Sequence, residues 1–327
     1  MTLFSRMKAL GVVVGMVALL VAGCSNASDL KPQPRVSTKT CEPTVPPFVG
    51  ERTIKATRPD GSTRLFTVNI PSGLDRNEPS PIVLAFHGLG GTSTSIIELG
   101  KLKDLSEESH VIVVAPQGTM AEFDKAGWSL SESGFSEDAA FVDQVLNEID
   151  EFACLDTNRV FAMGFSNGSV FAQKYACRPG SKITAVAGIS GPLAADSCSS
   201  GPVPLIYFHG TSDQVVPFSG GPTSIGDLAG VHESLSTWAS LNGCSSNEKV
   251  EEFVTHVERS TWADCPAGAD VRAYITVGGG HRWPGGYLTE VKDVHGTLET
   301  SLNATTRSWR FFEGVAKKRE KVNQATS

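Results

Sequence analysis

"VFAMGFSNGSVFA" occupies Val160–Ala172 and places Ser166 between two glycines, Gly164 and Gly168. An apolar run typical of a buried strand precedes the first glycine, and Ser169–Cys177 has the composition of a helix. A strand, Gly-x-Ser-x-Gly and a helix in this order predict a tight turn that exposes the serine hydroxyl at its tip. Both glycines fit this turn, because a Cβ at either position would clash with neighbouring backbone. Ser166 is therefore the candidate nucleophile, although so short a pattern arises by chance and needs support from the rest of the chain.

Size and charge narrow the function classes. The chain has 327 residues, 40% of them apolar, and a formal net charge of −7. This length is enough for one large core or two modest ones. The net negative charge argues against a nucleic-acid partner. The one basic segment, "KKREK" at Lys317–Lys321, is interpreted as the solvated end of a last helix.

The N-terminus has the pattern of an export signal. Arg6 and Lys8 precede an apolar stretch, Ala9–Ala22, that is too short for a comfortable membrane span. The stretch ends in "LVAGC", which resembles a bacterial lipobox whose cysteine, here Cys24, carries the lipid. We therefore predict a signal peptide over residues 1–23, a flexible tether over residues 24–50, and a lipid anchor on the outer face of the cell membrane or cell envelope. An ordinary signal peptide with a chance cysteine is the alternative.

The cysteines agree with export. Seven are present, and six remain if Cys24 is lipidated, an even number in an oxidising compartment. Cys244 and Cys265 bracket one connecting segment, so we predict that they pair. The pairing of the other four stays open: Cys41, Cys154, Cys177 and Cys198. The sequence has no Cys-x-x-Cys and no His-Glu-x-x-His motif, so no metal site is expected.

The pattern after the tether predicts one doubly wound α/β domain over residues 51–315, followed by a polar tail over 316–327. Arg52–Ile70 is expected to form an antiparallel hairpin that turns at Pro59-Asp60-Gly61. Continuous apolar runs then alternate with helix-length segments, as in a mostly parallel sheet covered on both faces. These runs are Pro81–Phe86, Val111–Ala115, Arg159–Gly164, Thr184–Ser190, Pro204–Phe208 and Val271–Val277. Helices are predicted over Glu137–Phe152 with Ser136 as its cap, over His232–Leu241 and over Thr306–Lys318.

A serine hydroxyl needs a base to remove its proton, and the base needs a carboxylate to fix its tautomer. A nucleophile on this kind of turn is followed along the chain by the acid and then by the histidine. Asp213 in "YFHGTSDQVVP" comes just after one predicted strand, and His281 in "VGGGHRWPGG" just after the last. The carboxyl ends of these strands meet at one edge of the sheet, where ligands bind. Three other histidines follow Asp213 and are weaker candidates: His232, His256 and His295.

Two backbone N–H groups are candidates for an oxyanion hole. One belongs to Asn167, the residue after the candidate nucleophile, and lies at the N-terminus of the predicted helix. The other belongs to Leu89 in "AFHGLGG", the Gly-rich segment after the first parallel strand. A Gly-rich turn without a catalytic role is the alternative interpretation of that segment.

With these motifs in place, the chain resembles the polyhydroxybutyrate depolymerase-like and feruloyl esterase-like carboxylesterases, which are secreted α/β-hydrolases. The resemblance runs from about Arg52 to Glu313 and rests on "FHGLGG", "GFSNG", "HGTSDQVVPFSGG", "GGGHRWPGG" and "SWRFF" in matching order. It implies an α/β-hydrolase fold with Ser166 as nucleophile, Asp213 as the orienting acid and His281 as the general base. Cys244 and Cys265 match positions that are often paired in such proteins. The chain departs from the family at Ser169-Val170, where a Gly-Met pair is common.

The resulting hypothesis is an exported serine esterase that acts on feruloyl, acetyl or hydroxyalkanoate esters through an acyl-enzyme. Trp283 and Trp128 are candidates for the wall of the acyl or aryl pocket, with core packing as the alternative. The chemistry needs no metal or organic cofactor, and the expected partners are an ester substrate and the membrane. Three other functions stay open: acyl transfer to an alcohol, as in mycolyltransferases of a related fold, peptide hydrolysis, and ligand binding on an inactive hydrolase scaffold.

Overall fold

The computed structural model describes residues 48–75, 77–120, 124–193, 195–245, 247–287 and 301–326. The predicted signal peptide, Cys24, Cys41, nearly all of the tether and His295 lie outside these residues, so the lipoprotein hypothesis stays a prediction. None of the helices in the described ranges is both long enough and apolar enough to cross a membrane.

The described part of the chain is built around a mixed sheet of ten strands. In spatial order these are β1 (Gly50–Thr57), β2 (Thr63–Ile70), β4 (Ile112–Pro116), β3 (Ser80–Phe86), β7 (Leu155–Phe165), β8 (Ala185–Ile189), β9 (Leu205–Gly210), β14 (Val271–Thr276), β13 (Val257–Trp262) and β12 (Lys249–Val254). The strands from β4 to β14 run parallel, and an antiparallel pair flanks them at each edge. Every residue of β3 and β4 is buried, which explains why these strands are continuously apolar rather than alternating.

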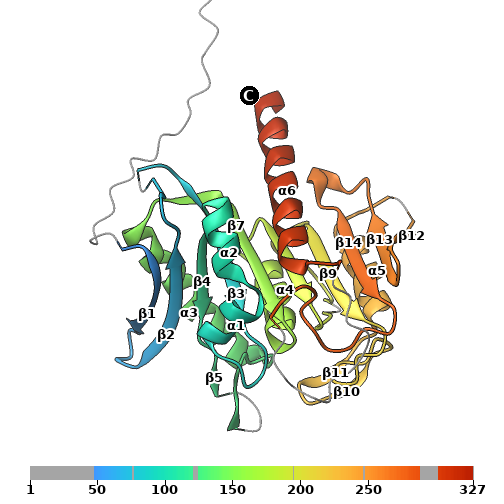
Figure 1. Cartoon of the computed structure of the whole chain (residues 1–327), viewed down its shortest axis with the longest axis horizontal. Helices are drawn as coiled ribbons and strands as arrows, with labels where there is room; N and C mark the ends of the chain where they lie inside the picture. The colour runs from blue at the N-terminus through green and yellow to red at the C-terminus, as the bar shows by residue number, and fades with distance from the viewer. Residues whose placement is uncertain are drawn as a thin grey trace, which may run out of the picture. The chain divides into compact units, whose positions relative to one another are not determined.

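Helices cover both faces of this sheet (Figure 1). One face carries α1 (Ser93–Leu99), α2 (Leu102–Ser109) and α6 (Ala304–Thr326), and the other carries α3 (Glu132–Phe152), α4 (Asn167–Cys177) and α5 (Val231–Leu241). Each layer has its own aromatic contacts with the sheet. Phe161 stacks on Phe312 of α6 with 4.6 Å between ring centroids, and Phe86 meets Phe171 of α4 at 5.1 Å on the opposite face. The doubly wound α/β prediction, with its leading β1–β2 hairpin, is confirmed.

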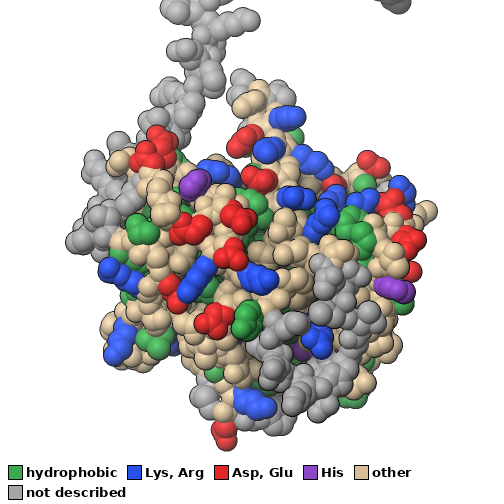
Figure 2. Space-filling view, viewed as in Figure 1, with side chains coloured by type: hydrophobic (Ala, Val, Ile, Leu, Met, Phe, Trp, Pro, Cys, Tyr) green, Lys and Arg blue, Asp and Glu red, His purple; other side chains and the backbone are tan. Residues whose placement is uncertain are grey.

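Several boundaries differ from the expectation. Helix α3 begins five residues earlier than predicted, so Ser136 lies inside the helix, where its hydroxyl donates to the Glu132 carbonyl at 2.9 Å instead of capping it. Helix α6 continues to Thr326 and includes the basic segment Lys317–Lys321. Lys and Arg side chains gather along this helix (Figure 2). The β12–β13 hairpin, whose strands are charged and partly exposed, was not predicted.

Two disulfides have both of their cysteines among the described residues. The predicted pair, Cys244–Cys265, is present and joins the segment after α5 to the β13–β14 connection. A second disulfide, Cys177–Cys198, joins the end of α4 to the segment before β9. In each disulfide the two cysteines are 21 positions apart in the sequence.

Candidate active site

The turn between β7 and α4 holds Ser166 in an uncommon backbone conformation. Its φ is 54° and its ψ is −121°, in a region that non-glycine residues rarely adopt. A Cβ on Gly164 would overlap the Gly168 carbonyl, and a Cβ on Gly168 would overlap the carbonyls of Phe86 and His87. The two glycines are therefore needed for close backbone approach, as the sequence predicted. The turn presents Ser166 at the carboxyl edge of the sheet, directly before the N-terminus of α4.

The acid and base candidates meet at the same edge. His281 Nδ1 lies 2.7 Å from Asp213 Oδ2, although the two residues are 68 positions apart. The Asp213 side chain is fully buried, and the His281 side chain is 9% exposed. A carboxylate accepts, so Nδ1 carries the hydrogen and Nε2 is left to act as a base. The structure thus brings these two residues together in the tautomer that proton abstraction requires.

The Asp213 carboxylate is also held from its other side. Its Oδ1 accepts hydrogen bonds from the backbone N–H groups of Val215 at 2.9 Å and Val216 at 2.8 Å. Burial raises the pKa of the Asp213 carboxyl, but the bond from His281 and the other donors outweigh it and leave the pKa below its ordinary value. Asp213 is therefore an anion at neutral pH.

The candidate nucleophile lies beside this pair. The Phe165 ring, one residue before Ser166, has its centroid 4.9 Å from that of His281. Ser166 itself is 8% exposed. Among the described residues the Ser166 hydroxyl makes no hydrogen bond to His281, and the geometry of such bonds is often loose without a substrate.

The two candidate oxyanion donors come from adjacent loops. A methyl group on Gly88 would lie 3.3 Å from Ser166 Cβ, so the loop after β3 passes directly over the nucleophile. In this loop Gly90 N–H donates to the Ala126 carbonyl at 2.6 Å, and Gly91 N–H donates to the Gly88 carbonyl at 2.9 Å. Within the described ranges neither Leu89 N–H nor Asn167 N–H has a backbone acceptor. Both are thus free to donate to a ligand.

His87 fixes the start of that loop. Its Nδ1 donates to the Gly88 carbonyl at 2.8 Å, and its Nε2 accepts from Gly118 N–H at 2.9 Å. Burial lowers the pKa of His87 below its ordinary value, so the ring stays neutral and keeps this one-donor, one-acceptor arrangement.

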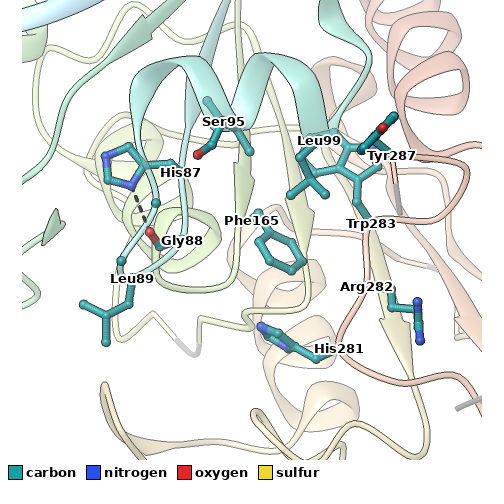
Figure 3. Close-up of a pocket in the computed structure, with 13 residues that line it drawn as sticks. His87, Gly88, Leu89, Ser95, Leu99, Phe165, His281, Arg282, Trp283 and Tyr287 are labelled. Carbon is teal, nitrogen blue, oxygen red and sulfur yellow. Dashed lines mark hydrogen bonds between the residues drawn. The ribbon is translucent and has the colours of Figure 1, made fainter. Parts of the chain in front are cut away.

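A cavity of about 380 Å³ opens between this loop and His281 (Figure 3). Ile96, Leu99, Phe165 and Trp283 form its apolar wall, with Tyr287 at the mouth. Figure 3 shows the His281 imidazole beneath the Phe165 ring, with Trp283 on one side and Leu89 on the other. Thr305 accepts a hydrogen bond from Trp283 Nε1 at 2.9 Å, which fixes the indole.

The structure places Trp283 in the cavity wall but does not place Trp128 there. Trp128 is 1% exposed and stacks on Phe171 at 4.6 Å, inside the core below the turn. The prediction that Trp128 lines the pocket is therefore corrected. Trp128 follows the β6 strand (Ala126–Gly127), and its indole packs under the site against the rings of Phe86 and Phe171. Its Nε1 donates to the His87 carbonyl at 3.0 Å.

The weaker histidine candidates lie elsewhere. His232 is the second residue of α5, and its Nε2 lies 3.4 Å from the Glu248 carboxylate. His256 occupies the β12–β13 turn with a φ of 64°. Neither lines the cavity. In the described part of the chain no group of three or more His, Cys, Asp or Glu side chains is arranged to hold a metal ion.

One buried histidine near the acid was not singled out from the sequence. His209 is the penultimate residue of β9, four residues before Asp213, and its Nε2 lies 3.4 Å from Asp213 Oδ2. It belongs to the same "YFHGTSD" segment, where a polar residue inside an apolar strand was the available signal.

Comparison with known proteins shows the family of the chain. A family model described as phospholipase/carboxylesterase matches residues 74–259. The chain belongs to the phospholipase/carboxylesterase family. It is 30% identical over 241 residues to feruloyl esterase D of Neurospora crassa, an alignment that covers 68% of this chain and 75% of that protein. It is also 25% identical over 281 residues to the putative esterase NocK of Nocardia uniformis, covering 78% and 80% of the two chains. The predicted membership among carboxylesterases is thus confirmed, and the chain is a carboxylic ester hydrolase.

A solved structure supports the fold independently. The acetyl xylan esterase from Aspergillus awamori superposes on this chain with a TM-score of 0.55. The superposition covers 80% of this chain and 99% of the esterase. At 16% sequence identity this likeness concerns the fold alone, which is the α/β-hydrolase fold.

Proposed function

We propose that the chain is an exported serine esterase in which Ser166, His281 and Asp213 form the catalytic triad. The observation that carries the proposal is the 2.7 Å contact between His281 Nδ1 and Asp213 Oδ2 at the same sheet edge as Ser166. The positive φ of Ser166 at the N-terminus of α4 supports the role of nucleophile.

In the proposed first half-reaction, Ser166 Oγ attacks the ester carbonyl carbon while His281 Nε2 takes the hydroxyl proton. Asp213 stabilises the imidazolium and keeps its orientation. The N–H groups of Asn167 and Leu89 donate to the negatively charged carbonyl oxygen of the tetrahedral intermediate, each worth about 3 kcal/mol. The intermediate then collapses, the bond to the alcohol oxygen breaks, and His281 returns its proton to that oxygen.

The second half-reaction reverses the roles. His281 removes a proton from water, and the hydroxide oxygen attacks the acyl carbon bound to Ser166. Collapse of the second tetrahedral intermediate releases the acid and returns a proton to Ser166 Oγ. Every step uses side chains and backbone groups of this chain.

The cavity wall supports a substrate whose acid part is apolar or aromatic. Ile96, Leu99 and Trp283 offer apolar surface in a volume of about 380 Å³, and Phe165 adds an aromatic ring next to the base. We propose esters of the feruloyl, acetyl or hydroxyalkanoate type, and the similarity to feruloyl esterase D of Neurospora crassa supports the first of these. Export is supported by the Cys177–Cys198 and Cys244–Cys265 disulfides, since such bonds persist in oxidising compartments.

The decisive experiment measures turnover of p-nitrophenyl esters of graded acyl length by the parent and by Ser166→Ala. We expect turnover and a burst of p-nitrophenol from the parent and neither from the variant. No turnover with any ester, or full activity in Ser166→Ala, would reject the proposal. Methyl ferulate, acetylated xylan and hydroxybutyrate oligomers then separate the substrate types. The mass of the mature N-terminus tests lipidation of Cys24 separately.

A further inference from the structure

We propose that His209 is a positioning residue of the triad, which holds the Asp213 carboxylate in the orientation that His281 requires. The proposal rests on the proposed function of Ser166, Asp213 and His281, and it adds a second imidazole next to the Asp213 oxygen that accepts from His281.

The contacts of His209 define its role. Its side chain is fully buried at the end of β9, where Nε2 lies 2.9 Å from the Val216 carbonyl oxygen. The same nitrogen is 3.4 Å from Asp213 Oδ2, the oxygen that accepts from His281. On the other side of the ring, Nδ1 lies 2.9 Å from the Tyr207 hydroxyl. His209 thus contacts both the acid and the turn that carries it.

The hydrogen-bond partners of the His209 ring fix which of its two nitrogens carries the hydrogen. A carbonyl oxygen only accepts, so Nε2 carries the hydrogen and donates it to Val216. Nδ1 therefore accepts, and the Tyr207 hydroxyl donates to it. The hydrogen bonds thus run from the Tyr207 hydroxyl through His209 to the Val216 carbonyl.

The surroundings keep His209 neutral. Burial lowers its pKa to about 4, although the Asp213 carboxylate opposes the shift. His281 is the other titratable group that faces it, and it lowers the pKa further. The ring of Phe218 covers one flank at 6.0 Å and offers no charge. In a neutral ring with hydrogen on Nε2, the positive end of the N–H bond lies near the Asp213 carboxylate. The ring does not take up the proton that lies between His281 and Asp213.

The link to catalysis runs through the Asp213 turn. The N–H of Val216 donates to Asp213 Oδ1, and the carbonyl oxygen of Val216 accepts from His209 Nε2. Val216 therefore links His209 to the Asp213 carboxylate. Without the imidazole, the Val216 carbonyl would be buried and unpaired, and the turn would shift to satisfy it. Such a shift rotates the carboxylate away from His281 Nδ1, and small misplacements of catalytic groups cost large factors in rate.

The test compares His209→Phe, which removes both ring nitrogens at similar shape, with His209→Gln, which keeps a side-chain N–H. We expect kcat on p-nitrophenyl acetate to fall about 10- to 100-fold in His209→Phe, with KM within about twofold. His209→Gln should recover part of this loss. The acid limb of the pH profile of kcat/KM should move to lower pH in His209→Phe, because a misaligned carboxylate stabilises the His281 imidazolium less.

A spectroscopic readout does not depend on turnover. The proton shared by His281 and Asp213 should give a far-downfield ¹H NMR signal in the parent, and this signal should move upfield and broaden in His209→Phe. An unchanged signal, together with an unchanged acid limb, overturns the proposal even if the variant is less stable. If the parent hydrolyses no ester, the proposed function fails, while the NMR signal still tests the positioning of Asp213.

Tyr207→Phe keeps the test decisive if His209→Phe does not fold. This variant removes one hydroxyl and leaves His209 without its donor at Nδ1, so we expect a smaller fall in kcat and the same direction of shift in the acid limb. Tyr175→Phe is the matched control, because it removes a buried tyrosine hydroxyl that donates to Asp143 at 2.6 Å, away from Asp213. Equal kcat values and equal pH profiles in the two tyrosine variants would overturn the inference.

Discussion

Trp128 and Asn167 are joined by two hydrogen bonds that face in opposite directions. Trp128 N–H donates to Asn167 Oδ1 at 2.7 Å, and Asn167 Nδ2 donates to the Trp128 carbonyl at 3.0 Å. The Trp128 indole also donates to the His87 carbonyl at 3.0 Å. The residue after the nucleophile is thereby tied to the loop that carries Leu89, so the two proposed oxyanion donors are held as one unit.

We expect Trp128→Phe to loosen this unit, because it removes the indole N–H and leaves the His87 carbonyl unpaired. The kcat/KM should fall about 10-fold, and the free energy of unfolding should fall by about 1 kcal/mol. Trp238→Phe is the control: its buried indole donates to the Val203 carbonyl at 2.8 Å, remote from the cavity. A similar loss of kcat/KM in both variants would show that general destabilisation explains the effect.

Asp213→Asn tests the orienting acid. The amide carries no charge and has one oxygen; when that oxygen accepts from the N–H groups of Val215 and Val216, its NH2 group faces His281 Nδ1 and favours the wrong tautomer of the imidazole. We expect kcat to fall by about 10⁴-fold with little change in KM and in the far-UV CD spectrum. Steady-state kinetics with active-site titration measure this, beside Asp227→Asn on the exposed β11 strand (Gly226–Leu228). A loss below about tenfold would remove Asp213 from the triad.

The sequence could predict those features that depend on local pattern. Short-range periodicity and spacing predict the strand and helix around Ser166 and the strand ends that carry Asp213 and His281. They also predict the Cys244–Cys265 pair. The parallel order of the central strands follows from the alternation of apolar runs and helices.

Features set by tertiary contact could not be predicted in the same way. Trp128 and Trp283 are both aromatic residues near glycines, and only packing decides that one lies under the turn and the other in the cavity wall. Asp138 in α3 is held by the buried Arg64 guanidinium at 2.7 Å across 74 positions of sequence, a contact that no local pattern indicates. His209 became notable only once its contact with Asp213 was seen.

Acid should destabilise the fold through buried neutral histidines. The pKa of His209 is about 4 in the folded chain, against about 6.5 for an unfolded histidine, so between these values the unfolded state binds more protons. Stability should therefore fall as pH drops below about 6.5 and level off below about 4, with His209 contributing about 3 kcal/mol. His87, whose pKa is also lowered by burial, acts in the same direction.

Urea unfolding followed by fluorescence near pH 7.5 and near pH 4 checks this expectation. The parent should lose more free energy of unfolding between the two conditions than His209→Gln does, since the variant lacks the titrating group. Equal losses in the two proteins would contradict the assignment of a neutral buried imidazole.

The Cys177–Cys198 and Cys244–Cys265 disulfides offer a matched pair. Both close loops of the same length, because the paired cysteines are 21 positions apart in each, so loop-closure entropy predicts similar stabilisation of about 3 kcal/mol for each. We expect Cys177→Ser/Cys198→Ser and Cys244→Ser/Cys265→Ser to lower Tm by comparable amounts. Calorimetry of each double variant, with the parent in reductant as reference, measures this. Strongly unequal losses would show that packing around one bridge outweighs the entropy term.

Trp283 should set the size of the acid that the cavity accepts. Its indole is 5% exposed, lines the cavity beside His281 and is fixed by its bond to Thr305, so a smaller side chain leaves space that bulky acyl groups can fill. In Trp283→Leu we expect the ratio of kcat/KM for a p-nitrophenyl ester of a bulky aromatic acid to that for acetate to rise about 10-fold, a shift of about 1.4 kcal/mol. The ratio cancels any general loss of activity. Trp309→Leu, on the α6 face that packs against Phe161 at 6.0 Å, controls for lost core packing and should leave the ratio unchanged. The same ratio in all three proteins would mean that the acyl group binds elsewhere than against Trp283.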